Sequence, residues 1–338
     1  MRLPKQIRGL LLAATMVVTP AVAQDAAKAP ENFLTRQLTI VVPYGPGGLT
    51  DARGRAFQAH MEKVVDVPVV VQNMSGGGAL VGINYAYSRP SDGTYVLIAS
   101  GSDGPHAHDV LSPAELGWEW ADWTPVGQFA MSILGFVVGE DSEFKTLMDA
   151  VEKVKAEPGS VTLASLGPGR ADDLYMLEFM QATDTLGKWN WVFYSSSATA
   201  QADILSGDVD IAYIGVSRKD MLDHPNFEVI AQGIKEDEKP ADWPYPWPTV
   251  AEAIGKDLDL IGASYATVFV KADTAPERID YLEHAFKTIV EDPDFIKDRD
   301  AYGEPALWRS RDAAQANLDE SNDKLREMKP LRDEHVNQ

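Results

Sequence analysis

The 338-residue sequence contains no cysteine. Disulfide bridges, zinc–cysteine sites and cysteine nucleophiles are therefore excluded, which suits an exported chain whose stability rests on its core alone. Histidine is scarce, at 6 residues. His106 and His108 are close in the chain, but no third ligand can be identified beside them. Neither a metal site nor a cofactor is therefore predicted.

Long apolar runs are also missing after the N-terminus, so no membrane helix of roughly 20 apolar residues is expected. Basic residues are outnumbered, with 30 lysines and arginines against 51 aspartates and glutamates, a net charge of −21. The electrostatic field of this negative charge repels nucleic acid and anionic membrane surfaces, so neither is expected as a partner. Solubility alone is a sufficient reason for the acidity.

Motifs of common enzyme classes are absent. No G-x-x-x-x-G-K-[ST] occurs, and the first glycine-rich turn lacks the G-x-G-x-x-G spacing, so a nucleotide is not expected. No G-x-S-x-G elbow of a serine hydrolase is present. Paired carboxylates are too common in so acidic a chain to indicate glycosidase chemistry. The sequence therefore does not predict an enzyme.

The N-terminus has the pattern of a secretory signal peptide. Arg2, Lys5 and Arg8 precede an apolar run, Gly9 to Val18, and Ala21-Val22-Ala23 forms an A-x-A cleavage site. We expect residues 1–23 to be a signal peptide cleaved after Ala23. The mature protein is expected in the periplasm.

Strands and helices alternate along most of the chain. The predicted strands are Leu38 to Val42, Val67 to Val71, Tyr95 to Ala99, Val161 to Ala164, Trp191 to Tyr194, Val209 to Ile214 and Tyr265 to Val270. The predicted helices between them are Ala52 to Val65, Ala79 to Ser88, Lys145 to Ala156, Asp172 to Ala182 and Ala198 to Leu205. This order predicts an α/β fold with doubly wound, mostly parallel sheets in two units. From Pro276 onward we expect three helical stretches without a strand, which cross back over the first unit.

Three glycine-bearing turns each follow a predicted strand. They are Gly45-Pro46-Gly47-Gly48, Ser100-Gly101-Ser102 and Ser165-Leu166-Gly167-Pro168-Gly169. The carboxyl ends of parallel strands share one edge, where ligands bind, and helix N-termini there offer free N–H groups to an anion. Each turn by itself could equally be only a tight turn; together they favour one anion-binding cleft.

An ordered set of motifs resembles one protein family. Pro43-Tyr44-Gly45-Pro46-Gly47-Gly48-Leu49-Thr50-Asp51 matches its P-[FY]-x-x-G-G-x-x-D, and Val70-Val71-Gln72-Asn73-Met74-Ser75-Gly76 matches V-V-x-N-x-x-G. Asp92-Gly93-Thr94-Tyr95-Val96-Leu97, the Ser165–Leu174 segment and Pro248-Thr249 with Glu252 follow in order. The chain is similar to the extracytoplasmic solute-binding receptors of tripartite tricarboxylate transporters, also called Bug proteins, over nearly all of its mature length.

The resemblance implies a two-domain periplasmic binding protein fold, type 2 like, with the ligand in the interdomain cleft. Domain 1 would be residues 24–136 plus 263–338, and domain 2 residues 137–262. The implied ligand-binding residues are Tyr44, Gly47, Gly48, Thr50, Asp51, Ser100, Ser102, Ser165, Gly169, Arg170, Ser195, Ser196 and Ser197. Within this set, Asp51 is expected to brace its loop by accepting N–H bonds rather than to touch the anion.

The second domain departs from the family pattern. Val192-Phe193-Tyr194-Ser195-Ser196 stands where the family reads V-P-Y-x-G, and Arg170 stands where a small residue is common. Two interpretations of Arg170 are open: it pairs as a bidentate fork with a second carboxylate of the ligand, or it is a surface residue at a helix start.

These observations predict a monomeric receptor that captures a di- or tricarboxylate or an aromatic carboxylate and delivers it to the permease subunits of a membrane transporter. Two alternatives remain at this stage. One is a periplasmic hydrolase on the same scaffold, and the other is a sensory receptor that serves a signalling protein.

Overall fold

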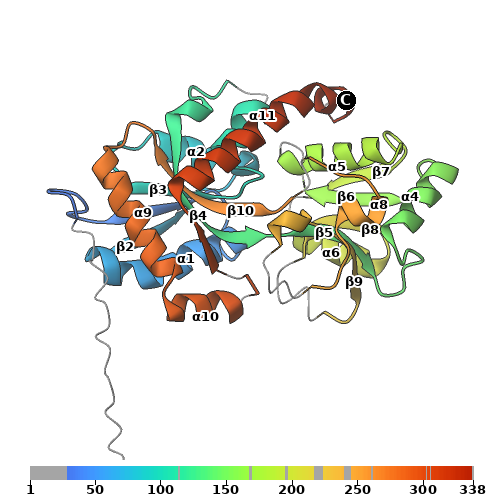
Figure 1. Ribbon diagram of the computed structural model, residues 1–338, viewed down its shortest axis with the longest axis horizontal. Coiled ribbons are helices and arrows are strands. Elements are labelled where there is room, and N and C mark those ends of the chain that lie inside the picture. The colour runs from blue at the N-terminus through green and yellow to red at the C-terminus, as the bar shows by residue number, and fades with distance from the viewer. Residues whose placement is uncertain are drawn as a thin grey trace, which may run out of the picture.

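The computed structural model describes residues 29–112, 115–166, 170–194, 197–216, 224–239, 245–259, 262–301, 303–304 and 306–336. The predicted signal peptide lies outside the described residues. Two lobes lie side by side, each built around one β-sheet (Figure 1). The first lobe is the one that contains the sheet β11-β4-β10-β3-β1-β2, and the second contains the sheet β7-β6-β8-β5-β9.

The N-terminal half of the first lobe follows the predicted alternation. Its elements are β1 (Leu38–Val42), α1 (Leu49–Val65), β2 (Val69–Asn73), α2 (Leu80–Tyr87), β3 (Tyr95–Ala99) and α3 (Pro105–Leu111). β1 is buried along its whole length and pairs in parallel with both β2 and β3. The turns after β1 and β3 consequently lie at the same edge of the sheet.

The second lobe repeats this arrangement. It contains β5 (Leu134–Gly139), α4 (Leu147–Ala156), β6 (Thr162–Leu166), α5 (Ala171–Ala182), β7 (Asn190–Tyr194), α6 (Ser197–Ser206), β8 (Ile211–Gly215), β9 (Phe227–Gly233) and α8 (Val250–Ile254). β6 pairs in parallel with β7 and β8. Local sequence sets several helix ends: reciprocal bonds between Thr146 and Asp149 begin α4, and Gly255 in the left-handed conformation ends α8.

Both sheets are mixed, which differs from the mostly parallel sheets expected from the sequence. β4 (Trp123–Ser132) leads through the single residue Ile133 into β5 of the other sheet, and β10 (Ser264–Lys271) returns. β10 runs antiparallel to β3 and β4, and β5 runs antiparallel to β8 and β9. The antiparallel pairs arise because these strands carry the chain between the lobes instead of closing a strand–helix–strand unit. β5 enters the second sheet slightly before residue 137.

The C-terminal segment also differs from expectation. After α9 (Pro276–Val290) and α10 (Pro293–Ala301), a short strand, β11 (Ala306–Arg309), precedes α11 (Arg311–His335). β11 pairs with β4 through Ala306 and Ala130, a partner far away in the chain. The prediction of three helices without a strand between them was therefore wrong, because four residues carry too little local pattern to reveal a strand.

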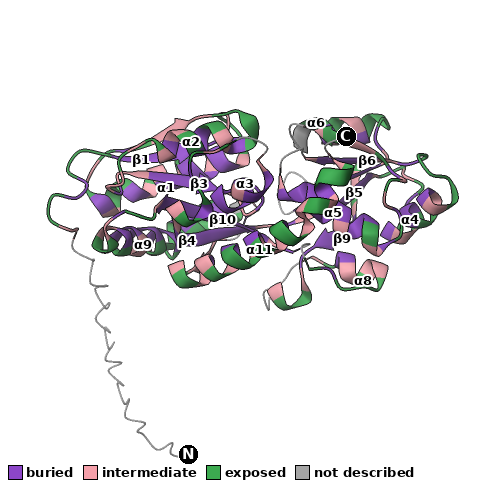
Figure 2. Ribbon diagram, turned by 90° about the horizontal axis from the view of Figure 1, so that it is seen from above, coloured by how far each residue is buried: buried purple, intermediate pink, exposed green. Residues whose placement is uncertain are grey.

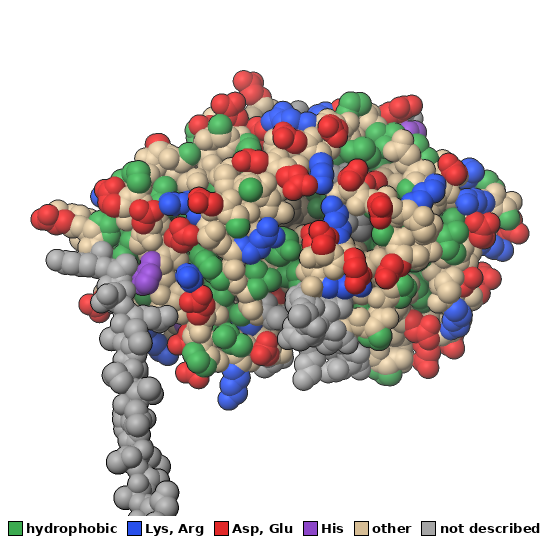
Figure 3. Space-filling view, in the orientation of Figure 1, with side chains coloured by type: hydrophobic (Ala, Val, Ile, Leu, Met, Phe, Trp, Pro, Cys, Tyr) green, Lys and Arg blue, Asp and Glu red, His purple; other side chains and the backbone are tan. Residues whose placement is uncertain are grey.

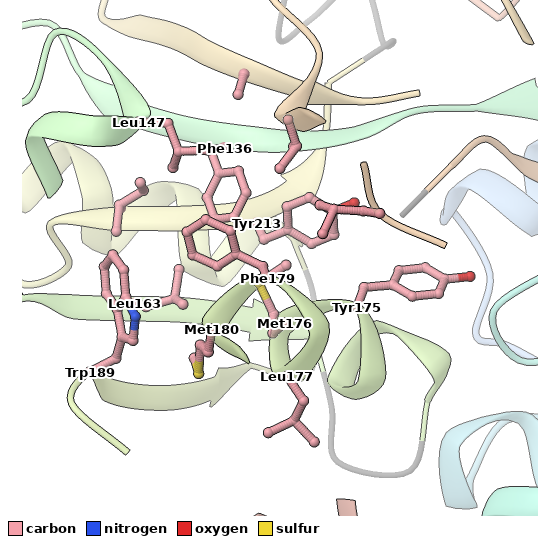
Figure 4. Packing of buried hydrophobic residues seen from close by; sticks show 14 of the residues in the cluster. Phe136, Leu147, Leu163, Tyr175, Met176, Leu177, Phe179, Met180, Trp189 and Tyr213 are labelled. Carbon is pink, nitrogen blue, oxygen red and sulfur yellow. The ribbon is translucent and has the colours of Figure 1, made fainter. Parts of the chain in front are cut away.

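Each lobe has its own apolar core, and the strands at the centre of both sheets are largely buried (Figure 2). In the second lobe the rings of Phe136, Phe179 and Tyr213 pack together, with centroids 4.8 and 5.0 Å from Phe136 (Figure 4). In the first lobe Phe57 of α1 packs edge-on against Phe129 and Phe286. Aromatic pairs of this geometry add specificity to the apolar burial.

Helix α11 contacts both lobes. It packs on α3 and β4 in the first lobe and on α5 in the second, and Leu325 belongs to the second lobe's core cluster. Arg332 of α11 forms a buried ion pair with Asp173 of α5 at 3.3 Å. The helix thus lies across the junction of the two lobes as well as over the first one (Figure 1).

Candidate functional site

The turn after β1 presents an open helix N-terminus. Gly47 and Gly48 are exposed, and α1 begins at Leu49 with Gly48 as its N-cap. No side-chain group in the described part of the chain caps this end. The first N–H groups of α1 point out of the helix without intrahelical partners, and the helix dipole adds positive potential there. Thr50, in the first turn, is buried.

Asp51 holds this turn in place. Its carboxylate accepts the backbone N–H of Gly47 at 2.8 Å, the side-chain amide of Asn73 at 2.9 Å and the Nε of Arg55 at 2.9 Å. Burial alone would raise the pKa of Asp51, but these three donors outweigh it and lower the pKa below its usual value. Asp51 is thus engaged within the protein, in the bracing role expected from the sequence.

The turn after β3 contains hydroxyl groups and an acid, Asp103, that was not among the predicted site residues. Ser100 Oγ lies 3.0 Å from Ser264 Oγ and 3.4 Å from Ser102 Oγ. Asp103 accepts the backbone N–H of Ser100 at 3.1 Å, and the hydroxyl of Tyr44 donates to the same carboxylate. Asp103 therefore joins the two turns of the first lobe to each other.

Arg170 connects the two lobes. It is the N-cap residue of α5 and extends its guanidinium to the first lobe. Its Nη1 donates to Asp103 Oδ2 at 2.6 Å and its Nη2 to Ser102 Oγ at 2.9 Å, while Nε donates to Asp172 Oδ2 at 2.8 Å. The Tyr44 hydroxyl lies 3.5 Å from Nη1. The side chain is 19% exposed, so it is neither a surface residue nor freely open to solvent.

The cluster of Arg170, Asp103 and Asp172 carries one positive and two negative groups. The side chains of Asp103 and Asp172 are only 2% and 1% exposed. Burial raises the pKa of Asp172 although Arg170 opposes this. Burial likewise acts against the charge of Arg170, but the carboxylates of Asp172 and Asp103 outweigh it and raise the pKa of Arg170. Burial and the nearby charge of Asp103 raise the pKa of Tyr44, which keeps its hydroxyl protonated and able to donate.

The remaining candidates divide into two groups. Ser165 is fully buried, and its hydroxyl accepts the indole N–H of Trp191 at 2.8 Å, so its side chain faces the interior of the second lobe. Gly169, Ser195 and Ser196 lie outside the described residues, as does the side chain of Ser197, the first residue of α6. The structure therefore brings together Tyr44, Ser100, Ser102 and Arg170.

Asp103 and Asp172 are the residues that sequence reasoning missed. Asp103 directly follows the Ser100–Ser102 turn, and Asp172 stands two positions after Arg170. An acid at such a place could have suggested a partner for Arg170. The pairing of Arg170 with Asp103 spans 67 positions, however, and only the fold brings these residues together.

A cavity of about 100 Å³ lies where α11 crosses between the lobes, and its lining includes Lys235 and Lys324 beside the acids Glu238, Asp259 and Glu320. Both lysines are bonded within the protein: Lys235 Nζ donates to the Asp259 carbonyl at 2.8 Å, and Lys324 Nζ to Glu320 at 2.6 Å. Acidic and basic side chains are intermixed on the face of the molecule seen in Figure 3. The acids in the lining outnumber the lysines, so this cavity offers no excess of positive charge to an anion.

The two histidines that are close together in the sequence are both bonded within the protein. The rings of His106 and His108 bond through Nε2 to the carbonyls of Gly101 and Gly78, at 2.9 and 2.8 Å. Among the described residues, no three His, Asp or Glu side chains are grouped so as to hold a metal ion. None of the helices described there is both long and apolar enough to traverse a bilayer.

Two lobes that face each other through strand-end turns, linked by strands that pass between them, define a two-domain periplasmic binding protein fold. Solved structures agree with this class. The chain matches Rpa4515 of Rhodopseudomonas palustris with adipate at a TM-score of 0.73 and 22% identity, covering 87% of this chain and 96% of that one. It matches MatC of R. palustris with bound malate at a TM-score of 0.72 and 18% identity, covering 88% and 99%.

Residues 54–330 match the model of the tripartite tricarboxylate transporter family receptor, and the chain belongs to this family. A relative from Pseudomonas sp. strain P51, described as the UPF0065 protein in the tcbD-tcbE intergenic region, is 28% identical over 294 residues, which are 86% of this chain and 83% of the relative. The resemblance drawn from the sequence motifs is confirmed.

Proposed function

We propose that this chain is a periplasmic receptor that binds a small carboxylate between its lobes and delivers it to the permease subunits of a tripartite tricarboxylate-type transporter. The observation that carries the proposal is the uncapped N-terminus of α1, next to the exposed Gly47 and Gly48. Two structural neighbours, MatC with bound malate and Rpa4515 with adipate, support a carboxylate as the ligand class.

The proposal extends to the rest of the binding site. Backbone N–H groups at Leu49 and Thr50 would hold one carboxylate of the ligand, and Gly169 with Ser195, Ser196 and Ser197 would face it from the second lobe. Tyr44, Ser100, Ser102 and Arg170 would form the rim, with Asp51 as the brace of the first turn. A ligand that contacts both walls stabilises the closed arrangement only, so closure would be a shift of population.

We further propose that the chain is exported with residues 1–23 as its signal peptide, acts as a monomer and binds without turnover. Its first domain would comprise residues 24–132 with 263–338, and its second the residues from Leu134 to 262. Sheet membership supports this division, since β4 and β10 belong to the first sheet and β5 to the second. Membership of a receptor family supports binding rather than hydrolysis.

The test is a titration of aliphatic and aromatic mono-, di- and tricarboxylates by calorimetry, with Leu49→Pro as the diagnostic variant. Proline is tolerated at the first helical position, and Gly48 before it is already extended (ψ 174°), so the helix should form without the Leu49 N–H. Loss of one charge-assisted bond should weaken carboxylate binding by roughly tenfold or more.

Leu49→Ala is the matched control, because it removes the same side chain and keeps the N–H. It should bind carboxylates nearly as well as the unaltered protein. If no organic acid bound, or if both variants lost affinity equally, the proposed anion site at α1 would be wrong.

A further inference from the structure

Arg170 extends its guanidinium from the start of α5 to the turn after β3, and its bonds there are made to groups of the protein itself. We propose that Arg170, Asp103 and Asp172 select ligands with a single carboxylate, whose far end is neutral and donates hydrogen bonds. The inference rests on the proposed function and narrows its ligand class, which at the level of the family includes dicarboxylates.

The first argument is an account of donors. A guanidinium binds a carboxylate as a fork through two of its three nitrogens. All three nitrogens of Arg170 already donate within the protein: Nε to Asp172, Nη1 to Asp103 and Nη2 to Ser102. These bonds, together with the 3.5 Å bond from Nη1 to the Tyr44 hydroxyl, use four of the five guanidinium N–H groups, so a second ligand carboxylate could form the two bonds of the fork only by displacing one of these partners. If the displaced partner is Asp103 or Asp172, a buried carboxylate is left without its counter-charge, which is strongly unfavourable.

The second argument is charge. Two carboxylates around one guanidinium leave a net negative charge, and burial reduces the screening of that charge by salt. A second carboxylate at this position would be repelled by the cluster. An amide or a hydroxyl carries no charge and avoids this repulsion.

The third argument concerns hydrogen-bond polarity. Tyr44 donates its hydroxyl proton to Asp103, and its oxygen accepts only a long bond, at 3.5 Å, from Arg170 Nη1. Oδ1 of Asp172 is buried and has no hydrogen-bond partner among the described residues. Acceptor oxygens are therefore in excess around Arg170, and a ligand group that donates suits this cluster better than one that only accepts.

The test compares each diacid with its half-amide, which has the same length and shape but one charge less. Suitable pairs are succinate and succinamate, glutarate and glutaramate, and terephthalate and 4-carbamoylbenzoate, titrated by calorimetry into the ligand-free protein. We expect the half-amide to bind at least tenfold more tightly than the diacid in every pair that binds. A diacid that bound as tightly as its half-amide, or more tightly, would overturn this inference alone. Absence of binding by both members of all pairs would overturn the proposed function as well.

The variant Asp103→Asn tests whether the Arg170 cluster causes the preference for the half-amide over the diacid. The substitution keeps the size of the side chain and removes one charge, which frees Arg170 to bind a second carboxylate. The preference for the half-amide should fall by about tenfold. Asp172→Asn should act in the same direction and serves as the second variant if the first does not fold.

Asp298→Asn is the matched control. It changes the net charge of the protein equally, but Asp298 is 66% exposed and pairs with His60. Its ratio of half-amide to diacid affinity should equal that of the unaltered protein. An equal change in the control would mean that the overall charge, and not the Arg170 cluster, sets the preference, and it would refute the inference.

Discussion

The backbone N–H of Ala171, at the start of α5, donates to the carbonyl oxygen of Ser102 at 3.0 Å. This bond joins the second lobe to the first beside the side-chain bonds of Arg170 to Ser102 and Asp103. The two lobes are thus in direct contact at the rim of the candidate site.

Replacing Arg170 with alanine should open the ligand-free protein. The substitution removes the bonds across the lobes and leaves Asp103 and Asp172 without their shared cation, so the facing carboxylates repel each other. Small-angle X-ray scattering should show a larger radius of gyration. The control is Arg326→Ala, an arginine that is 56% exposed and pairs with Asp109. An equal radius of gyration for both variants and the unaltered protein would contradict the prediction that the bonds of Arg170 hold the two lobes together.

Glu304 should be among the most costly residues to alter for stability. Its carboxylate is 1% exposed and pairs with Arg53 and Arg299, which are 2% and 4% exposed. Burial would raise the pKa of Glu304, but the two arginines outweigh it and lower the pKa. Glu304→Gln removes the carboxylate that both buried guanidinium groups share and should cost about 3–5 kcal/mol in urea unfolding.

Glu320→Gln provides the comparison for Glu304. Glu320 is 65% exposed and pairs with Lys324 on the same helix. Exposed pairs of this kind contribute roughly 0.3–0.5 kcal/mol. A similar loss in both variants would show that the Arg53–Glu304–Arg299 network is not what holds this region together.

His106 should make stability fall at acidic pH. Burial lowers its pKa from 6.5 to about 4, so between these values the unfolded chain binds a proton that the folded chain does not. The contribution of His106 is complete above pH 6.5 and is lost as the pH falls to about 4. The loss should reach about 3 kcal/mol, from 1.36 kcal/mol for each pKa unit.

The measurement for His106 is urea unfolding at pH 7 and pH 4.5, on the unaltered protein and on His106→Gln. The unaltered protein should lose more stability than the variant over this interval. His284→Gln, at a partly exposed histidine on α9, should keep the pH dependence of the unaltered protein. A variant that retained the full acid sensitivity would show that His106 is not its source.

Gly82→Ala in α2 should displace the turn between β1 and α1, where the candidate anion site lies. A Cβ at Gly82 would lie 2.5 Å from Pro43 Cα and 2.8 Å from the Met74 carbonyl oxygen, and both are backbone atoms. Because Pro43 begins the turn that leads to Gly48, α2 would push against that turn. We expect a loss of about 1–3 kcal/mol and weaker binding of carboxylates.

Gly139→Ala is the control for Gly82. Its Cβ would meet its nearest neighbour at 3.5 Å, an ordinary contact, and Gly139 lies in β5 of the other lobe. Carboxylate affinity should be unchanged in this variant. Unaltered binding in Gly82→Ala would mean that the turn tolerates the displacement or that it does not hold the ligand.

Elements with a strong local pattern could be predicted from the sequence. β1 and β3 were predicted at their observed bounds, and the helix predicted over Lys145 to Ala156 is observed as α4, where Leu147, Ala150, Val151 and Val154 recur at helical spacing. β4, β5 and β9 were not predicted, since each depends on partners that the antiparallel crossing brings from far away. The same difference between local and long-range contacts applies to the candidate site. Asp51 braces Gly47 four positions earlier, a contact within reach of local reasoning, whereas the partners of Arg170 in the first lobe were not foreseen.

The sequence alone determined the α/β class, the glycine turns at strand ends and the motifs of the family, because each depends on residues near one another in the chain. Tertiary structure alone decided that the sheets are mixed, that α11 contacts both lobes and that Arg170 is paired with Asp103 of the other lobe. The physical reason is that a buried charge takes whichever counter-charge the fold places beside it. In this protein, the fold adds Asp103 to Asp172, the acid that already follows Arg170 in the sequence.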